Sequence, residues 1–385
     1  MKIFVSTGEV SGDLQGSMLI KSLYKVALER NINLEIAGLG GDRMRATGAN
    51  IIADTAVIGS MGFIEALPFV LPTLKIQRLT KKYIQADPPD ILVLIDYPAS
   101  NLALASYVKK YMPQIPIVYY IAPQDWAVPM LNNTPKIAKV VDKLLAIFPQ
   151  EAEYFKSKEI DVTWVGHPLL DRLKTSPDKV QARLNLGIEP EAKIVTLLPA
   201  SRQQEIKYLL PVMCQAAIQI QQQLPEVQFL IPVSLSAYKE VIKTAIKNHN
   251  LTARILDGSS LDAIAAADLA ITKSGTVNLE IALLNIPQVV IYRINPLTAW
   301  IARKILRFSI PLMSPPNLIV QRKIVPELQQ EAVTANNITT EAIQLLSNTQ
   351  KCSDIIAGYT KMRSLLGHIG VCDRTATEIL NLKKQ

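Results

Sequence analysis

The stretch DILVLIDYPASN, residues 90–101, decides the fold, because it joins an uninterrupted apolar run to a single carboxylate. Residues 91–95 are all leucine, isoleucine or valine, a pattern typical of a parallel strand that is buried on both faces. Asp96 follows at once, and a charge at the end of a buried strand costs free energy unless it is paired or used in chemistry. A second such run, IPIVYYIAP at residues 115–123, favours a parallel α/β sheet.

Strand-like and helix-like segments alternate along the chain in two successive series. The first series starts at KIFVST, residues 2–7, and the second at KIVTLLPASR, residues 193–202. This order predicts two doubly wound, Rossmann-like domains, and the division we expect is 1–170, 171–345, and a helical segment, 346–385, that packs back on an N-terminal domain of its own chain or of a partner. In such sheets, ligands bind at the carboxyl ends of the strands, which is where Asp96 is expected.

Composition narrows the class of protein. The chain has 385 residues, a net charge of +8 and three widely scattered cysteines, without metal-type spacing. We read no signal peptide at the N-terminus and no apolar run long enough to span a bilayer, so we expect a cytoplasmic protein. No nucleic-acid motif accompanies the positive charge, which suits a phosphate-bearing substrate or an anionic membrane. No Asp-X-Asp pair is present, which disfavours metal-held diphosphate chemistry. We expect neither a metal nor a cofactor.

The turn STGEVSGD, residues 6–13, is the first candidate binding loop. Gly8 and Gly12 allow a tight turn, and Ser11 or Asp13 could cap the helix that follows. The loop lacks the G-x-G-x-x-G fingerprint, which disfavours a nicotinamide dehydrogenase. An ordinary capped turn between strand and helix is an equally good interpretation. A second glycine turn, GLGGDRM at residues 38–44, is ambiguous in the same way.

The segment KSGTVNLE, residues 273–280, is the most informative short motif. Ser274, Gly275 and Thr276 offer N–H and hydroxyl groups to a pyrophosphate, and Glu280, one turn later, could accept both hydroxyls of a ribose. Arg202, in PASRQQEI, is a candidate anion ligand at the start of another helix. The alternatives are an ordinary helix cap and a solvated arginine. His167, alone beside a proline, is more often structural.

Two apolar segments with basic neighbours suit the face of an anionic bilayer. The first, residues 64–83, places apolar side chains just before a run of lysine and arginine; these membrane candidates are Leu67, Phe69, Val70, Leu71 and Leu74. The second, residues 297–313, repeats the pattern around Trp300. The alternative is a core helix with a solvated basic edge.

Taken together, these motifs resemble those of the lipid-A-disaccharide synthase family, glycosyltransferases of GT-B fold. The likeness runs almost end to end, through GEVSGDLQG, GLGGDRM, SMGFIEAL, IDYPASN, AIFPQEAEYF, VTWVGHPLLD, PASRQQEI, KSGTVNLE, YRINPLTAWIAR, SPPNLIV, VPELQQ and LLGHIGVCDRTATEIL. The resemblance implies an inverting transfer from UDP-2,3-diacylglucosamine to the 6-hydroxyl of 2,3-diacylglucosamine 1-phosphate, with release of UDP. It also implies a peripheral protein on the inner face of the inner membrane, and a homodimer.

The resemblance assigns roles to individual residues. Asp96 matches the family's essential acid and would be the general base. The nucleotide-binding residues would be Arg202, Ser274, Gly275, Thr276 and Glu280. The glycine-loop and acceptor-side residues would be Gly8, Glu9, Ser11, Gly12, Asp13 and Asn317. The apolar residues of the 64–83 segment match the family's membrane-associating element.

Several positions depart from the family pattern. Val10 stands in place of alanine, Ala99 in place of an acid, and Lys273 and Asn278 are new in the segment that usually reads ASGTATLE. PASR replaces PGSR, and APQDWAV replaces SPSVWAW. These departures keep two alternatives open: a GT-B relative with an altered acceptor or weak catalysis that binds lipid or nucleotide, and a UDP-sugar 2-epimerase. The latter would need several acids and histidines in its cleft, and the chain has three histidines.

Overall fold

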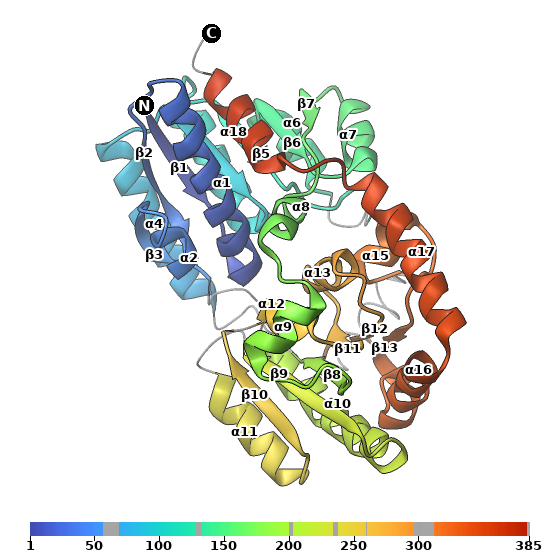
Figure 1. Ribbon diagram of the computed structural model, residues 1–385. Helices are drawn as coiled ribbons and strands as arrows, with labels where there is room; N and C mark the ends of the chain where they lie inside the picture. The colour runs from blue at the N-terminus through green and yellow to red at the C-terminus, as the bar shows by residue number, and fades with distance from the viewer. Residues whose placement is uncertain are drawn as a thin grey trace. The chain divides into compact units, whose positions relative to one another are not determined.

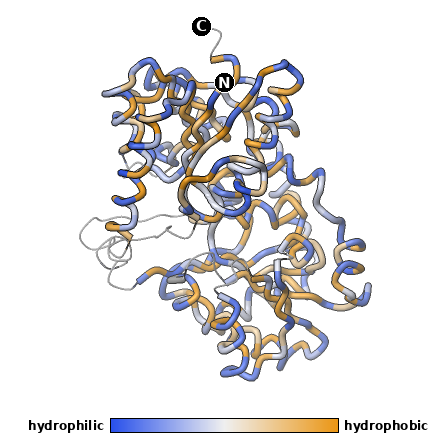
Figure 2. Tube along the Cα trace, turned by 90° about the vertical axis from the view of Figure 1, so that its left-hand side faces the viewer, coloured by the Kyte–Doolittle hydropathy of each residue, from blue (hydrophilic) through white to orange (hydrophobic). Residues whose placement is uncertain are grey.

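The computed structural model describes residues 1–56, 69–127, 132–199, 203–233, 238–258, 260–295, 300 and 312–382. The chain divides into two compact units (Figure 1). The first unit combines Met1–Asp171 with the C-terminal Leu366–Gln385, and the second is Arg172–Leu365. Hydrophobic residues run along the strands, whereas the helices alternate between hydrophobic and hydrophilic residues (Figure 2), so each unit has its own core.

Within the described residues, the first unit is built on a seven-stranded sheet of order β3-β2-β1-β4-β5-β6-β7, all parallel. Its strands are β1 (Lys2–Ser6), β2 (Glu35–Gly40), β3 (Asn50–Asp54), β4 (Ile91–Ile95), β5 (Ile117–Tyr120), β6 (Lys143–Ala146) and β7 (Val162–Trp164). Its helices are α1 (Glu9–Glu29), α2 (Asp42–Arg45), α4 (Val70–Ala86), α5 (Pro98–Tyr111), α6 (Thr134–Val140), α7 (Pro149–Lys156), α8 (Leu169–Arg172) and α18 (Val371–Asn381).

The second unit repeats the design with a described sheet of order β10-β9-β8-β11-β12-β13, again parallel. Its strands are β8 (Lys193–Leu198), β9 (Val227–Val233), β10 (Ala253–Asp257), β11 (Leu269–Lys273), β12 (Gln288–Tyr292) and β13 (Glu327–Gln329). Its α-helices are α9 (Lys179–Leu186), α10 (Gln203–Gln223), α11 (Lys239–Asn248), α12 (Ser260–Ala265), α13 (Val277–Leu283), α15 (Pro315–Val320), α16 (Ala335–Ser347) and α17 (Thr349–Leu365). The 3₁₀ helices named for the described residues of this unit are η3 (Leu173–Thr175) and η6 (Gln330–Ala332).

The two apolar runs that predicted the fold are the centre of the first sheet. Every residue of β4 and of β5 is buried, as expected for strands covered by helices on both faces. Burial of such a run stabilises the folded state by about 1.5–3 kcal/mol for each large apolar side chain that leaves water. The prediction of an α/β fold with two Rossmann-like domains is confirmed.

Strand order fixes where a ligand can bind in each unit. In the first sheet, successive strands add outward from β1 in one direction and from β4 in the other, so the order reverses between these neighbours. In the second sheet, the reversal lies between β8 and β11. Helices leave such a point on opposite faces, which opens a crevice at the carboxyl ends of the two strands. The motifs STGEVSGD and IDYPASN flank the first point, and PASRQQEI and KSGTVNLE flank the second.

The C-terminal helix α18 lies beside α1 (Figure 1), so the last residues complete the first unit. Asp171 accounts for this attachment. Its carboxylate accepts backbone N–H bonds from Gly370 (2.5 Å), Val371 (3.2 Å) and Cys372 (2.8 Å), the first turn of α18. A carboxylate there satisfies orphan donors and complements the helix dipole. The helical C-terminal segment is broken between Leu365, where α17 ends, and Val371, where α18 begins.

Candidate active site

Asp96 lies at the carboxyl end of β4, on a backbone that adjacent side chains hold in place. Its φ is +46° and that of Tyr97 is +49°, a left-handed conformation that is uncommon for non-glycine residues. The Asn101 amide donates to the carbonyl oxygens of Ile95 (3.1 Å) and Asp96 (2.6 Å), and to that of Ser6 at 3.2 Å. The network therefore ties the end of β1 to the end of β4 and fixes the half-buried Asp96.

The Tyr119 hydroxyl adds a second donor to the carbonyl oxygen of Asp96, at 3.0 Å. Burial raises the pKa of Tyr119 well above its ordinary value, so this hydroxyl stays protonated and donates. Sequence reasoning did not find Asn101 or Tyr119 as positioning residues. The usable signal was the amide at the end of the motif IDYPASN, five residues after the carboxylate.

The glycine loop after β1 packs directly against Tyr97. A Cβ atom on Gly8 would lie 2.6 Å from Cγ of Tyr97, so only glycine lets the two loops of the crevice meet. The next residue, Glu9, has φ +64° and begins α1. Non-glycine residues in strained conformations thus gather on both sides of the crevice, a feature that often marks functional sites.

Asp13 has a structural role that differs from the expectation. We expected Ser11 or Asp13 to cap α1, but the cap position is Gly8, which has no side chain to accept from the first-turn N–H groups. The buried Asp13 carboxylate instead accepts from the backbone N–H groups of Gly41 (2.7 Å), Arg43 (3.1 Å) and Met44 (3.0 Å). The reason is that Asp13 lies inside α1, facing the second glycine turn.

Gly12, also in α1, has tight surroundings, since a Cβ there would meet Thr7 Oγ1 at 2.0 Å. Gly12 therefore allows α1 to approach the end of β1. Ser11 lies on the same turn of α1 and is half-buried. Of the five loop residues, Gly8, Gly12 and Asp13 are buried, while Glu9 and Ser11 are half-buried.

Glu151, near the carboxyl end of β6, is a buried acid that sequence reasoning missed. Its Oε2 accepts from the backbone N–H groups of Ile147 (2.8 Å) and Phe148 (3.2 Å), closing a capping box at the start of α7. Its Oε1 has no hydrogen-bond partner among the described residues. Burial raises the pKa of Glu151 to about 8, with a contribution from the charge of nearby Asp96, so the carboxyl is mostly protonated at neutral pH.

An aromatic stack leads from this acid to His167. The Phe148 ring lies 5.8 Å from that of Trp126 and 5.4 Å from that of His167. His167 is buried, its Nδ1 accepts from the N–H of Leu169 at 3.2 Å, and burial lowers its pKa to about 3. His167 is therefore a neutral packing residue.

Asp125, one of the departures from the family pattern, is also a structural residue. It is buried and accepts from both the N–H and the hydroxyl of Thr134 at 2.8 Å each, and from the Asn133 amide at 3.0 Å. Its carboxylate therefore anchors the start of α6.

In the second unit, the candidate nucleotide-binding residues Ser274, Gly275 and Thr276 follow the carboxyl end of β11. The Ser274 hydroxyl donates to the carbonyl of Met313 at 2.8 Å, and the Gly275 N–H donates to Oδ1 of Asn278 at 2.7 Å. These two groups, which we expected to offer to a pyrophosphate, are thus already hydrogen-bonded within the chain. Thr276 is half-buried and directly precedes α13.

Glu280, on α13, forms an ion pair with Arg172 at the start of the unit. Both side chains are mostly buried, so the pair is better insulated from water than a surface salt bridge. Arg172 therefore fixes the direction of the carboxylate that we expected to accept ribose hydroxyls. Arg202, the other predicted nucleotide ligand, lies outside the described residues.

Asn317 lies in the second unit, on α15, and is fully buried. Its Nδ2 donates to the carbonyl of Val325 (3.0 Å) and to Glu327 (2.8 Å). Its Oδ1 accepts from the N–H groups of Ile324 (2.6 Å) and Val325 (2.9 Å). Both ends of the amide are thus engaged inside the unit, where they join α15 to the segment entering β13.

The candidate membrane residues that the structure describes are largely exposed. Val70 is 46% exposed, Leu71 71% and Leu74 50%, while Phe69 is half-buried. The alternative that α4 buries these three residues in a core is wrong for this chain. Leu67 and most of residues 297–313 lie outside the described residues. Among the described helices, none has the length and apolar character required to cross a bilayer.

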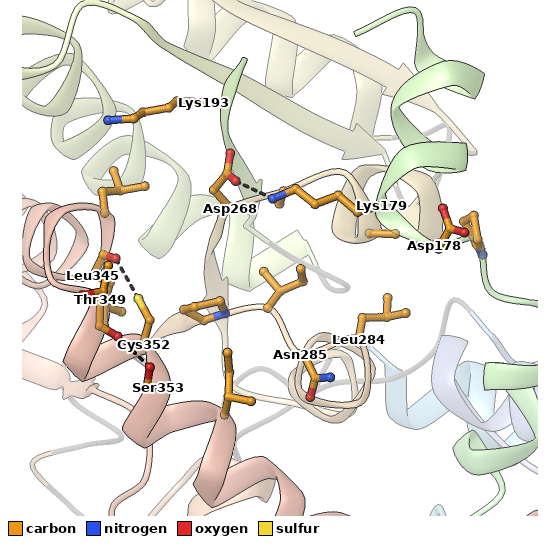
Figure 3. Close-up of a pocket in the computed structure, with 17 residues that line it drawn as sticks. Asp178, Lys179, Lys193, Asp268, Leu284, Asn285, Leu345, Thr349, Cys352 and Ser353 are labelled. Atoms are coloured by element: carbon orange, nitrogen blue, oxygen red, sulfur yellow. Dashed lines mark hydrogen bonds and ion pairs between the residues drawn. The ribbon is translucent and has the colours of Figure 1, made fainter. Parts of the chain in front are cut away.

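Figure 3 shows a cavity of about 660 Å³ in the second unit, and none of the candidate nucleotide-binding residues lines it. Lys193, at the first position of β8, and Asp268, just before β11, mark its place at the amino ends of the strands. Lys179 pairs with Asp268 at its edge, at 2.6 Å. The cavity is therefore on the opposite edge of the sheet from Ser274 and Glu280, and it is not part of the candidate donor site.

Comparison with known proteins decides the family. The sequence model described as lipid-A-disaccharide synthetase matches residues 3–379. A lipid-A-disaccharide synthase from Gloeothece citriformis is 54% identical over 382 residues, which cover 99% of this chain and 100% of that protein. The chain belongs to the lipid-A-disaccharide synthase family. The resemblance drawn from its motifs is confirmed, and the chain is a glycosyltransferase of this family.

Solved structures related to this family member share its fold. A putative UDP-N-acetylglucosamine 2-epimerase from Listeria monocytogenes has a TM-score of 0.70 at 14% identity, covering 100% of this chain and 96% of that one. The glycosyltransferase of kitacinnamycin has a TM-score of 0.63 at 13% identity, covering 99% and 98%. At such low identity, these likenesses show the GT-B fold alone, so the epimerase likeness adds no support for an epimerase activity in this synthase-family chain.

Proposed function

We propose that the chain transfers the sugar of UDP-2,3-diacylglucosamine to the 6-hydroxyl of 2,3-diacylglucosamine 1-phosphate, forming a β-1,6-linked disaccharide with inversion and releasing UDP. Membership of the synthase family supports this choice of substrates. The observation that carries the mechanism is the Asp96 carboxylate at the carboxyl end of β4, on a backbone fixed by Asn101 and Tyr119.

Asp96 is the general base of this proposal. It takes the proton of the acceptor's 6-hydroxyl while that oxygen attacks the anomeric carbon of the donor. The bond from the anomeric carbon to the β-phosphate oxygen breaks, and its electron pair leaves with UDP. Glu151 is the neighbouring acid, but it is mostly protonated at neutral pH and so is a poor proton acceptor. Glu151 is therefore not the base in this proposal, and Asp96 takes that role.

The first unit binds the acceptor in this proposal, with Gly8, Glu9 and Ser11 lining the other side of the crevice from Asp96. The close packing of Gly8 on Tyr97 supports this assignment, because it brings the glycine loop to the base. The second unit binds UDP through Thr276 and Glu280, together with Arg202, while Ser274 and Gly275 shape the turn through their internal hydrogen bonds. The ion pair with Arg172 supports the assignment of Glu280 to the ribose, since it orients the carboxylate.

The start of α4 is the membrane-contact surface in this proposal, which places the enzyme on the inner face of the inner membrane. Exposed apolar side chains are followed on the same helix by exposed Lys75, Arg78 and Lys82. Apolar residues can enter the lipid interface while the basic residues meet anionic headgroups. A substrate with acyl chains remains in the bilayer, so an enzyme that acts on it gains from binding there.

The test is acceptor-dependent UDP release by the purified protein in mixed micelles, with Asp96→Asn as the variant. We expect the variant to lose 10²–10⁴-fold in kcat, about the contribution of a general base, and to keep its affinity for UDP. Asp87→Asn is the matched control, because Asp87 pairs with Lys2 at the amino end of the same sheet. Turnover of Asp96→Asn within tenfold of the parent would exclude Asp96 as the base. No disaccharide from the parent protein would overturn the proposed function.

A further inference from the structure

Lys273 is the last residue of β11 and lies at the reversal of strand order in the second unit. It belongs to the set of departures, because the family pattern has alanine at this position. Its backbone is therefore at the carboxyl edge of the sheet, where an open α/β sheet binds its ligand. A lysine at that point brings a positive charge that the family pattern does not require.

Lysine side chains usually reach into water, but the side chain of Lys273 does not. The residue is only 9% exposed. A Cβ atom placed on Gly275 would lie 2.8 Å from the Lys273 Nζ and 3.3 Å from its Cε, so the side chain folds back over the turn that follows its own strand. The ammonium group thus lies against the Ser274–Thr276 turn of the candidate donor site.

A buried partner holds the ammonium group there. The Nζ of Lys273 lies 3.2 Å from Oε1 of Glu205, and the two side chains are 11% and 14% exposed. Glu205 is on α10, the helix that follows β8, so this ion pair joins the two chain segments that flank the reversal of strand order.

A buried ion pair contributes little to stability, because desolvation of both charges offsets most of their attraction. A gain in stability therefore does not explain why a lysine stands where the family pattern has alanine. A negatively charged ligand that binds the lysine explains it better. An ammonium group carries three N–H donors and can hold a carboxylate and a phosphate oxygen at the same time.

We propose that Lys273 binds the diphosphate of the nucleotide sugar and stabilises the charge of the departing UDP, with Glu205 as the residue that positions its ammonium group. This inference rests on the proposed function, since it concerns the same donor. When the sugar–oxygen bond breaks, the leaving diphosphate gains negative charge, and a fixed cation at that place lowers the barrier.

The experiment compares the affinities of UDP and uridine for the parent protein and for Lys273→Met. Calorimetry measures UDP, and ligand-observed NMR measures the weaker uridine. We expect the dissociation constant of UDP to rise tenfold or more and that of uridine to change less than twofold. Lys193→Met is the matched control, because Lys193 forms an ion pair of the same length, 3.2 Å, with Glu226 at the amino edge of the sheet. It should leave both affinities unchanged.

The double variant Lys273→Met, Glu205→Gln distinguishes two roles of Lys273. In one role Lys273 binds the phosphate, and in the other it only neutralises the charge of Glu205. It also removes both buried charges, so it serves where the single variant fails to fold. UDP binding that stays weak in the double variant supports the proposal. Recovery of parental affinity, or unchanged UDP binding in the single variant, would overturn it. A parent protein that binds no UDP would refute the proposed function itself, whereas the other results leave that function standing.

Discussion

Replacing Glu151 with glutamine should change how the stability of the first unit depends on pH. Glutamine keeps a carbonyl oxygen for the N–H groups of Ile147 and Phe148, so the capping box persists. What it removes is the titratable proton. The buried carboxyl of Glu151 has a pKa of about 8 in the folded protein, against an ordinary value of 4.5 in the unfolded chain.

The sign of the effect follows from proton binding in the two states. Between pH 4.5 and 8, the unfolded chain releases the Glu151 proton and the folded chain keeps it. The free energy of unfolding therefore falls by about 1.4 kcal/mol for each pH unit gained in this window. At pH 7 the Glu151 contribution by itself has lowered the stability of the parent protein by about 3 kcal/mol relative to pH 4.5, and the glutamine variant lacks this contribution.

His167 has the opposite effect on how stability depends on pH, so its contribution must be separated from that of Glu151. Its pKa is about 3 when folded, against an ordinary 6.5, so it contributes stability that is lost as the pH falls from 6.5 to 3. The two slopes cancel between about pH 4.5 and 6.5, where the parent protein should be most stable. Because His167 is present in both proteins, its contribution drops out of their difference.

The assay is urea unfolding followed by tryptophan fluorescence at pH 5, 6, 7 and 8. Trp126 and Trp164 belong to the first unit, and Trp300 is replaced by phenylalanine in every protein so that the first unit alone reports. Glu153→Gln, at an exposed position of α7, is the matched control and should shift stability by the same small amount at each pH. A difference between Glu151→Gln and the parent that stays flat from pH 5 to 8 would refute the reasoning.

Two further predictions concern α4 and Asn317. Serine at Val70, Leu71 and Leu74, three exposed positions of α4, should abolish flotation with phosphatidylglycerol vesicles and leave the urea midpoint unchanged. The control Leu184→Ser, 67% exposed in the second unit, should change neither flotation nor the urea midpoint. Unchanged flotation would remove α4 as the membrane contact. Asn317→Ala should destabilise the second unit by about 3 kcal/mol, because it strands buried N–H and C=O groups. Loss of activity without loss of stability would instead place Asn317 in the substrate site.

Sequence alone determined the fold class, because a parallel sheet covered on both faces leaves a local signature. The continuous apolar runs at residues 91–95 and 117–120 have no polar alternation, and this pattern excludes a sheet with one face in water. The turn motifs between the segments, read together and in order, also determined the family. Both kinds of information lie within short stretches of chain, so no tertiary contact was needed to read them.

Tertiary structure alone decided which polar residues build the scaffold and which remain for chemistry. Asp13 caps a helix 29 residues away from it in sequence, at Asp42, and Asp171 caps one that begins at Val371. Asn317 matches a family motif and was expected in the site, but its amide forms hydrogen bonds inside the unit. Such partners are chosen by strand order and by the packing of distant loops. Composition and periodicity carry no record of these contacts, which is why Glu151 and the folded-back side chain of Lys273 became visible only in three dimensions.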